Sequence, residues 1–256
     1  EIIRKTRALR FLRAGKRITA VVASKEGKEV TFRGDYFIST MPIRELVHGL
    51  TPPAPDHLRQ IGQGLVYRDF LTIGLLLEGL EVMDRGSGEN RFPSDTWIYI
   101  QEPDVMVGRI QIFNNWSPYL VADPSKVWIG LEYFCNETDA LWRQGDAAIA
   151  SHAIGELSKT GIIQASKVLD STVIRMPKAY PAYFGAYDRF GELREWLDQL
   201  ENLFLIGRNG MHRYNNMDHS MLTAMAAVNA ISEGIHTKHA IWAVNSEDDY
   251  HEEISS

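Results

Sequence analysis

Residues 202–230 read NLFLIGRNGMHRYNNMDHSMLTAMAAVNA, and this stretch decides the fold class. It opens with an uninterrupted apolar run, residues 202–206, which is typical of a strand buried on both faces. The run stops at Gly207, and a polar turn over residues 208–216 follows. Beyond the turn, apolar residues recur near a period of 3.6 and predict a helix. Its apolar positions are Met217, Met221, Ala224, Met225, Val228, Ile231 and Ile235.

Short runs of β-branched and aromatic residues predict further strands along the chain. These are residues 2–11, 17–23, 29–33, 35–42, 69–80, 96–101, 107–114, 127–134 and 168–176. Turns at 14–16 and 25–28 join the first three strands as hairpins. Helices are predicted at 43–50, 55–62, 146–160 and 190–200, with Thr138 or Asp139 as the cap of one more.

The fold class that follows is α+β, with a mixed, largely antiparallel sheet, helices on one side of it, and a strand–turn–helix unit near the C-terminus. A strand buried on both faces needs parallel neighbours, yet no other βαβ unit is evident. The chain also opens at Glu1 without a methionine, in strand-forming sequence. We therefore expect the remaining parallel strands to belong to an N-terminal portion that this sequence lacks.

Composition limits the classes of function. Hydrophobic residues make up 45% of the 256 residues and charged residues 23%, which is ordinary for a soluble globular protein of one large or two smaller domains. The net charge is −6, but an acidic tail at residues 247–253 supplies most of it, so the body is close to neutral and carries no footprint for nucleic acid. No apolar run approaches the ~20 residues of a membrane span. The single cysteine, Cys135, permits no intrachain disulfide, so we expect a cytoplasmic protein.

The turn after residue 206 has the properties of a ligand site. A helix N-terminus presents unpartnered N–H groups and partial positive charge, which suit a phosphate, a carboxylate or the electron-rich edge of a flavin ring. Gly207 lets the backbone approach a flat ligand, and Arg208 adds a planar cation. An ordinary strand–turn–helix with Asp218 in its first helical turn is the alternative interpretation.

The same stretch closely resembles the C-terminal flavin-binding segment of UDP-galactopyranose mutases and of related amine oxidases and protoporphyrinogen oxidases. The residues that carry the resemblance are Gly207, Arg208, Tyr214 and the pair Met217–Asp218. The resemblance implies FAD as cofactor. It places Arg208 and Tyr214 near flavin and substrate as candidate catalytic residues, and it assigns Gly207, Arg208, Met217 and Asp218 to cofactor binding.

A second segment, DYFISTMP at residues 35–42, resembles the strand of this family that returns to the nucleotide domain. The resemblance places Ser39, Thr40 and Pro42 near the adenosine half of FAD. It implies that residues 1–42 and 191–240 belong to the FAD-binding domain and that 43–190 form a substrate-binding domain. The acids near the end of the chain predict that 241–256 are an acidic tail. MPKAYPAYFGAYDRF, residues 176–190, is also similar, and the resemblance extends to about Gly234.

The chain departs from the family in one respect. The family begins with a strand and a G-x-G-x-x-G turn that grips the FAD pyrophosphate. Here Gly62-Gln63-Gly64 is followed by Tyr67 where glycine is required, and Gly86-Ser87-Gly88 by Arg91. The expected partner is therefore the missing N-terminal half of the same protein.

Several other residues are candidates for the substrate site. Arg109 and Trp116 lie on and after a predicted strand, and Tyr180 and Tyr183 precede the flavin segment; core or surface packing is the alternative for all four. His212 and His219 flank the motif and could carry a proton. The histidines have no ligand spacing that predicts a metal site. Cys135 is expected to be a buried structural thiol.

Three functions remain open. The preferred one is an FAD-dependent oxidoreductase of the amine oxidase type that acts on a small molecule. The second is a mutase-like isomerase, which needs arginines for two substrate phosphates; Arg109 and Arg175 are the further candidates. The third is a non-catalytic binding or assembly module, with homo-oligomerisation through surfaces that the missing half leaves bare.

Overall fold

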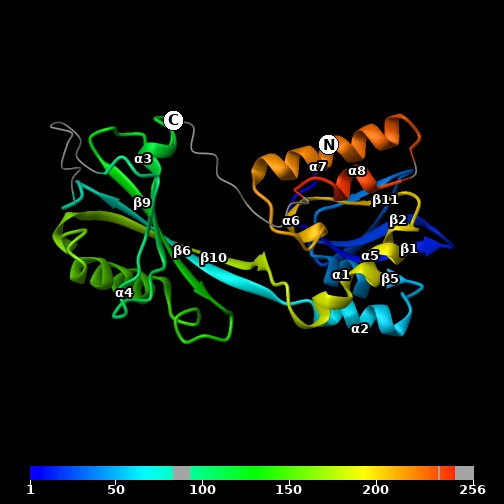
Figure 1. The fold of residues 1–256 in the computed structure, drawn as a ribbon, viewed down its shortest axis with the longest axis horizontal. Helices are drawn as coiled ribbons and strands as arrows, with labels where there is room; N and C mark the ends of the chain where they lie inside the picture. Colours follow the sequence, from blue (N-terminus) through cyan, green and yellow to red (C-terminus); the bar gives the residue numbers. More distant parts are fainter. Residues whose placement is uncertain (83–92, 236, 246–256) are drawn as a thin grey trace. The chain divides into compact units, whose positions relative to one another are not determined.

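The computed structural model describes residues 1–82, 93–235 and 237–245, and the chain forms two compact units (Figure 1). Unit 1 consists of Glu1–Tyr67 and Tyr180–Ser256, and unit 2 of Arg68–Ala179. The boundaries thus differ from those predicted at 42/43 and 190/191. They lie elsewhere because the helices at 43–64 share a core with the N-terminal strands and with the helix at 190–198.

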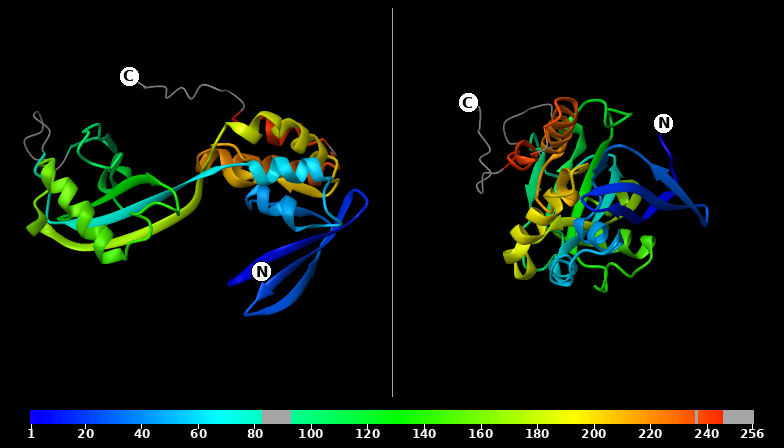
Figure 2. Two further views of the ribbon diagram at one scale, coloured as in Figure 1. Left: turned by 90° about the horizontal axis from the view of Figure 1, so that it is seen from below. Right: turned by 90° about the vertical axis from the view of Figure 1, so that its right-hand side faces the viewer.

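An antiparallel meander opens unit 1, as predicted, and Figure 2 shows it in blue. β1 (Thr6–Ala14) pairs with β2 (Arg17–Lys25), and β2 pairs with β3 (Lys28–Arg33). The two turns contain Gly15 and Gly27 with φ of +58° and +80°, a conformation that glycine adopts without steric cost. The short β5 (Leu50–Thr51) lies parallel to β1 and completes the sheet order β3-β2-β1-β5.

The second sheet of unit 1 is a parallel pair made from opposite ends of the chain. β4 (Phe37–Ser39) lies beside β11 (Leu203–Leu205), with Leu203 opposite Phe37 and Leu205 opposite Ser39. All three residues of β11 are buried, as the apolar run predicts. The predicted parallel neighbour exists, but it is β4, which lies within this sequence.

Helices enclose these strands. They are α1 (Ile43–Gly49), α2 (Asp56–Gly64), α5 (Phe190–Asp198), α6 (Gly207–Gly210), α7 (Met217–Ser232) and α8 (His239–Trp242). Buried side chains from all of them except α6 join β11 in one hydrophobic core. Asn202 ties the core together, because its amide accepts from the Ile18 N–H (2.8 Å) and donates to the carbonyls of Ile18 (2.8 Å) and Asp35 (2.9 Å).

Helix α7 leaves most of its large apolar residues exposed. Its buried positions are the small residues Thr223, Ala227 and Ala230, which allow a close approach to the strands. Met217, Met221, Leu222, Met225 and Val228 are instead exposed. The period predicts the helix correctly, but the side that packs on the core is the one with the smaller residues.

Unit 2 is a five-stranded sheet in the order β10-β6-β9-β8-β7. Its strands are β6 (Tyr67–Leu77), β7 (Trp97–Tyr99), β8 (Arg109–Ile112), β9 (Val127–Cys135) and β10 (Val168–Pro181). Neighbours from β6 to β7 pair antiparallel, as predicted. α4 (Asp146–Lys159) packs its buried residues Ile149, Ala153 and Leu157 into the same core as alternate strand residues such as Leu71 and Leu131.

The mixed helix-and-sheet class with an antiparallel sheet is confirmed, with local differences. No helix begins at Thr138 or Asp139, where the chain makes turns, and α3 (Phe113–Trp116) replaces the end of the strand predicted to reach residue 114. Two short 3₁₀ helices, Ala165–Lys167 and Gly185–Arg189, complete the elements. Cys135 is buried, and burial raises the pKa of its thiol. Among the described residues, no helix has the length and apolar character to cross a membrane.

Candidate functional site

The carboxyl ends of the parallel strands β4 and β11 bring two predicted cofactor segments together. The Ile206 N–H donates to the Ser39 carbonyl at 3.0 Å. A Cβ at Gly210 would lie 2.5 Å from that carbonyl oxygen, so α6 packs directly on the end of β4. Ser39 itself is buried, and its hydroxyl has no partner among the described residues, whereas Thr40 is exposed. Ligands of open parallel sheets bind beyond this end of the strands.

Gly207 is the point where β11 turns into α6. Its φ is +71°, and a Cβ there would meet only Ser220 Oγ at 3.8 Å. Its N–H is held by the Thr223 hydroxyl at 3.2 Å. The left-handed backbone explains the glycine, and the surrounding space leaves room for a flat ligand.

The guanidinium of Arg208 lies beside a stacked pair of tyrosine rings. Its guanidinium carbon lies 4.6 Å from the centroid of Tyr214 and 5.2 Å from that of Tyr180. The two rings are stacked with centroids 5.8 Å apart. Arg208 also donates from Nε (3.0 Å) and Nη2 (2.8 Å) to the Asn215 carbonyl. A stacked, doubly hydrogen-bonded guanidinium keeps one orientation.

Tyr183 also holds the turn that contains Tyr214. Its hydroxyl accepts a short hydrogen bond from the backbone N–H of Tyr214, and its ring contacts Tyr187. Burial raises the pKa of Tyr183, so the phenol is neutral at physiological pH. The structure thus gathers four predicted site residues, Arg208, Tyr214, Tyr180 and Tyr183, in one cluster of unit 1, which we call the Arg208 cluster.

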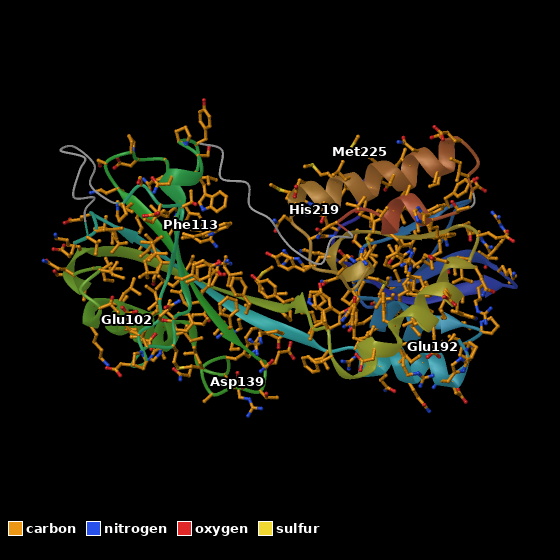
Figure 3. All side chains as sticks on the ribbon, in the orientation of Figure 1. Glu102, Phe113, Asp139, Glu192, His219 and Met225 are labelled. Atoms are coloured by element: carbon orange, nitrogen blue, oxygen red, sulfur yellow. The ribbon has the colours of Figure 1, made fainter. Side chains whose placement is uncertain are left out.

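The start of α7 carries a capping box. The Asn216 side chain accepts from the backbone of His219, and the His219 ring accepts from the Asn216 N–H at 3.2 Å. Figure 3 labels His219 near the start of this helix. The same ring nitrogen lies 3.5 Å from the exposed Asp218 carboxylate. This cap, which pairs asparagine with histidine, departs from the common Ser/Thr and Glu/Gln pattern. Met217 and Asp218 are exposed in the first turn.

His212, one of the two candidate proton carriers, is completely buried. Its Nε2 contacts the Ala182 carbonyl at 3.1 Å, and its ring packs edge-on against Tyr67 with centroids 4.7 Å apart. Nδ1 has no partner among the described residues. Burial lowers the pKa of His212, so the neutral ring has a packing role in the turn.

Residues beyond the predicted FAD segment also hold the turn. The Asn245 amide donates to the Tyr214 carbonyl (2.8 Å), and Arg213 donates to the Trp242 carbonyl (2.9 Å). Trp242, which the sequence assigns to the tail, is buried in the core of unit 1; residues 246–256 of that tail lie outside the described residues. Buried Lys238 donates to carbonyls at the end of α5 and just beyond it, and the shortest of these bonds reaches Leu200 at 2.7 Å. The sequence gives no signal for these contacts, because each of them joins segments that lie apart in the chain.

Arg109 and Trp116 lie in unit 2, joined through Trp97. Arg109 pairs with the buried Glu132, with Nη2–Oε2 at 2.5 Å and Nε–Oε2 at 2.6 Å. Its guanidinium lies 5.3 Å from the Trp97 ring, which packs edge-on against Trp116 at 4.9 Å. Sequence reasoning missed Glu132, since a single acid in an apolar strand shows no partner until β8 and β9 pair.

Two glycines leave space for neighbouring side chains on the same sheet. Gly74 of β6 and Gly130 of β9 lie directly opposite each other. A Cβ at Gly130 would lie 2.8 Å from the Phe113 ring, and one at Gly74 would lie 2.9 Å from Thr172. The missing side chains therefore let an aromatic ring lie on the sheet next to the Arg109–Glu132 pair.

The end of the strand pair fits a bound flavin. It combines open space at Gly207, the first turn of a sixteen-residue helix and a nearby oriented cation. Residues 207–208 and 217–218 would hold the ring, and the exposed Thr40 is better placed for contact than the buried Ser39. No group of three or more metal-ligating side chains occurs within residues 1–82, 93–235 and 237–245.

Comparison with solved structures gives the chain a relative in fold. Reduced UDP-galactopyranose mutase superposes with a TM-score of 0.71 over 93% of this chain and 48% of that one, at 19% identity. The chain shares its fold with UDP-galactopyranose mutase. A protein assigned as a protoporphyrinogen oxidase from Exiguobacterium sp. 255-15 matches 90% of the chain (46% of its own) at 16% identity and TM-score 0.57.

A putrescine oxidase variant from a redesign of cofactor binding matches 89% of the chain and 48% of its own, at 10% identity and TM-score 0.56. No protein-family model matches, and no curated protein matches significantly. The family resemblance read from residues 35–42 and 202–230 is confirmed at the level of the fold. The chain spans less than half the length of each of these three solved structures.

Proposed function

We propose that this chain carries the substrate-binding unit and the flavin-covering segment of an FAD-dependent oxidoreductase of the amine oxidase type. The supporting observation is the meeting of the β4 and β11 carboxyl ends with Gly207 and the start of α7. This is the place where open parallel sheets bind nucleotides. When bound, FAD supplies hydride acceptance, and the protein supplies position and electrostatics.

The Arg208 cluster has the role of orienting the substrate beside the flavin. The guanidinium is fixed by Tyr180, Tyr214 and the Asn215 carbonyl, so it presents its charge without reorganising. The Tyr214 backbone is held at its N–H by Tyr183 and at its carbonyl by Asn245. Arg208 and Tyr214, the two candidate catalytic residues, therefore lie on a turn whose backbone is fixed by hydrogen bonds.

The paired charges of the arginines in unit 2 favour a neutral or aromatic substrate and argue against a diphosphate. The charge of Arg109 is balanced by Glu132. Arg175 donates to Asp146 at 2.6 Å and to two backbone carbonyls. Two substrate phosphates would need cations that are not already paired, and neither arginine offers one. We therefore propose Arg109 and Trp116 as part of an aromatic, charge-balanced surface for a small molecule.

A second candidate is a flavin-dependent isomerase similar to UDP-galactopyranose mutase. The observation in its favour is the higher TM-score of that structure, 0.71 against 0.57 and 0.56 for the two oxidase matches. A reduced-flavin assay with a nucleotide sugar separates the candidates, because only the isomerase returns the flavin unchanged after conversion. Reduction of the flavin by an amine under anaerobic conditions would support the oxidoreductase.

The absorption spectrum of the purified gene product tests the proposed function. We expect flavin bands near ~450 nm, supplied by FAD as the protein uses it. Gly207→Val should lower the flavin content, because a branched side chain fills the open space at φ +71°. Gly161→Val is the matched control, since Gly161 ends α4 with φ +74° and open space around it. A colourless protein that takes up no added FAD would leave a non-catalytic module as the better interpretation.

A further inference from the structure

Glu132 is a buried carboxylate in the middle of the unit 2 sheet. It is 1% exposed on β9, and its neighbours in the chain, Leu131 and Tyr133, point to the opposite face and join the core that contains α4. Arg109 of β8 lies directly across the ladder from Glu132, and Tyr99 of β7 lies directly across from Arg109. The ion pair therefore lies on the face of the sheet that turns away from α4, where Tyr99 is 64% exposed.

Both oxygens of this carboxylate are held by side chains of β8. Oε2 accepts from Arg109 Nε at 2.6 Å and lies 2.5 Å from Nη2, and Oε1 accepts a short hydrogen bond from the Gln111 amide. A buried ion pair adds little net stability, because the cost of removing both charges from water offsets their attraction. The pair does, however, cancel the charge of Arg109 at this face.

The guanidinium of Arg109 is oriented by aromatic side chains of β7. Its carbon lies 5.3 Å from the centroid of Trp97 and 5.7 Å from that of Tyr99. Nη1 donates to the Tyr99 hydroxyl at 3.4 Å. The Arg109 side chain is 15% exposed, so it reaches the surface in a fixed orientation. A ligand on this face meets a planar group whose positive charge is balanced by Glu132.

An arginine can serve two classes of ligand, and a carboxylate partner decides between them. A guanidinium with an unbalanced charge binds phosphates and carboxylates through charge-assisted hydrogen bonds. When a carboxylate lies against the guanidinium, its repulsion of an anion offsets the attraction, whereas an uncharged ring still stacks on the planar group. Loss of the Glu132 charge alone, with the shape of the side chain kept, should therefore create an anion site.

We propose that Glu132 is the specificity-determining residue of the surface around Arg109, because its buried carboxylate excludes anionic ligands and admits uncharged ones. This role rests on the proposed function and assigns its substrate to the class without negative charge. Glu132 acts through the charge of Arg109 and through the hydrogen bonds that fix the guanidinium.

Calorimetric titration of the complete gene product with inorganic pyrophosphate tests this role. We expect Glu132→Gln to bind pyrophosphate about tenfold more tightly than the wild type, because the guanidinium is no longer balanced. Arg109→Gln/Glu132→Gln, which lacks the cation, should not gain this affinity. Gln111→Glu/Glu132→Gln moves the carboxylate to β8 beside Arg109 and should not gain it either. Glu137→Gln, exposed just beyond β9, makes the same change of net charge and should behave as the wild type does.

Pyrophosphate bound elsewhere is common to all five proteins, so only the differences between them count. The role of Glu132 would be overturned if Glu132→Gln, with the near-ultraviolet circular dichroism of the wild type, gained no affinity. It would also be overturned if the wild type bound pyrophosphate that Arg109→Gln/Glu132→Gln did not bind. This second comparison is independent of whether Glu132→Gln folds, because the double variant leaves no uncompensated buried charge.

Flavin absorbance of the same samples separates this role from the proposed function. A Glu132-dependent exclusion of pyrophosphate in a protein that takes up no FAD would keep the specificity residue and remove the flavin function. Bound flavin in a protein whose pyrophosphate affinity is the same with and without the Glu132 charge would do the reverse.

Discussion

Single residues shape the site in two ways: a glycine lets two backbone segments approach closely, and burial keeps a histidine neutral. Gly210 was part of the quoted motif, but only the structure shows that its missing side chain admits the Ser39 carbonyl of β4. His212 lies in the same turn and is neutral because it is buried. The motif by itself identifies Arg208 and Tyr214. Tyr180, whose ring stacks on that of Tyr214, is suggested by the sequence only because it lies in an aromatic-rich segment.

Gly210→Ala should destabilise the protein by about 1–3 kcal/mol, because the new Cβ overlaps a backbone oxygen that cannot rotate away. Gly191→Ala in α5 meets nothing within 4 Å, and it should stabilise by about 0.5–1 kcal/mol through helix propensity. Urea unfolding of both variants measures whether each substitution lowers or raises the free energy of unfolding. Equal small effects would show that α6 does not pack on the end of β4.

His212 should make the protein less stable in acid. Its pKa is lowered by burial from the ordinary 6.5, so the unfolded chain binds a proton that the folded ring resists. Stability is therefore complete above about pH 6.5 and falls below it. His212→Asn tolerates the φ of +47° and does not titrate, so its free energy of unfolding should depend less on pH between 6.5 and 5. Parallel curves for the two proteins would contradict this.

Elements are held at the site by contacts between distant segments. Lys238, just before α8, donates to the carbonyls of Leu197, Asp198 and Leu200 at the end of α5. The same C-terminal segment bonds the turn through Trp242 and Asn245. The end of α5 and residues 213–214 are therefore fixed by one short stretch, residues 238–245, of which the sequence assigns the part from 241 onward to a tail.

Lys238 should give stability that rises with pH in the alkaline range. Burial lowers its pKa from 10.5 to about 8, so the unfolded chain binds the extra proton between these values, and stability increases from pH 8 toward 10.5. The full rise is about 3 kcal/mol at roughly 1.4 kcal/mol per pKa unit. The difference in unfolding free energy between the wild type and Lys238→Met should widen over this range. If this difference in unfolding free energy stayed constant between pH 8 and 10, the lowered pKa of Lys238 would be contradicted.

The whole molecule has two hydrophobic cores that share no residue. Unit 2 is continuous in sequence, whereas unit 1 is assembled from both ends of the chain. The strands β4 and β11 that frame the candidate flavin site come from those two ends, so the site depends on contacts of high sequence separation. Such contacts form only after the loop between them has closed.

Core substitutions should therefore act on one unit at a time. Leu75→Ala and Leu197→Ala each remove a fully buried side chain, one from each core, and should cost about 2–5 kcal/mol. Hydrogen exchange should accelerate in residues 68–179 for the first variant and in residues 1–67 and 180–235 for the second. Acceleration across both units by either variant would show that they unfold together.

The sequence by itself determined the type and order of most elements, the buried strand at 203–205, the turn with Gly207 and Arg208, and the family resemblance that the shared fold confirms. These follow from periodicity and turn chemistry, which act over a few residues. Tertiary structure alone decided that α7 turns its small residues inward, that Glu132 balances Arg109, and that residues 238–245 brace the turn. Those outcomes depend on which distant surfaces meet, and a local pattern contains no information about a partner that is far away in the chain.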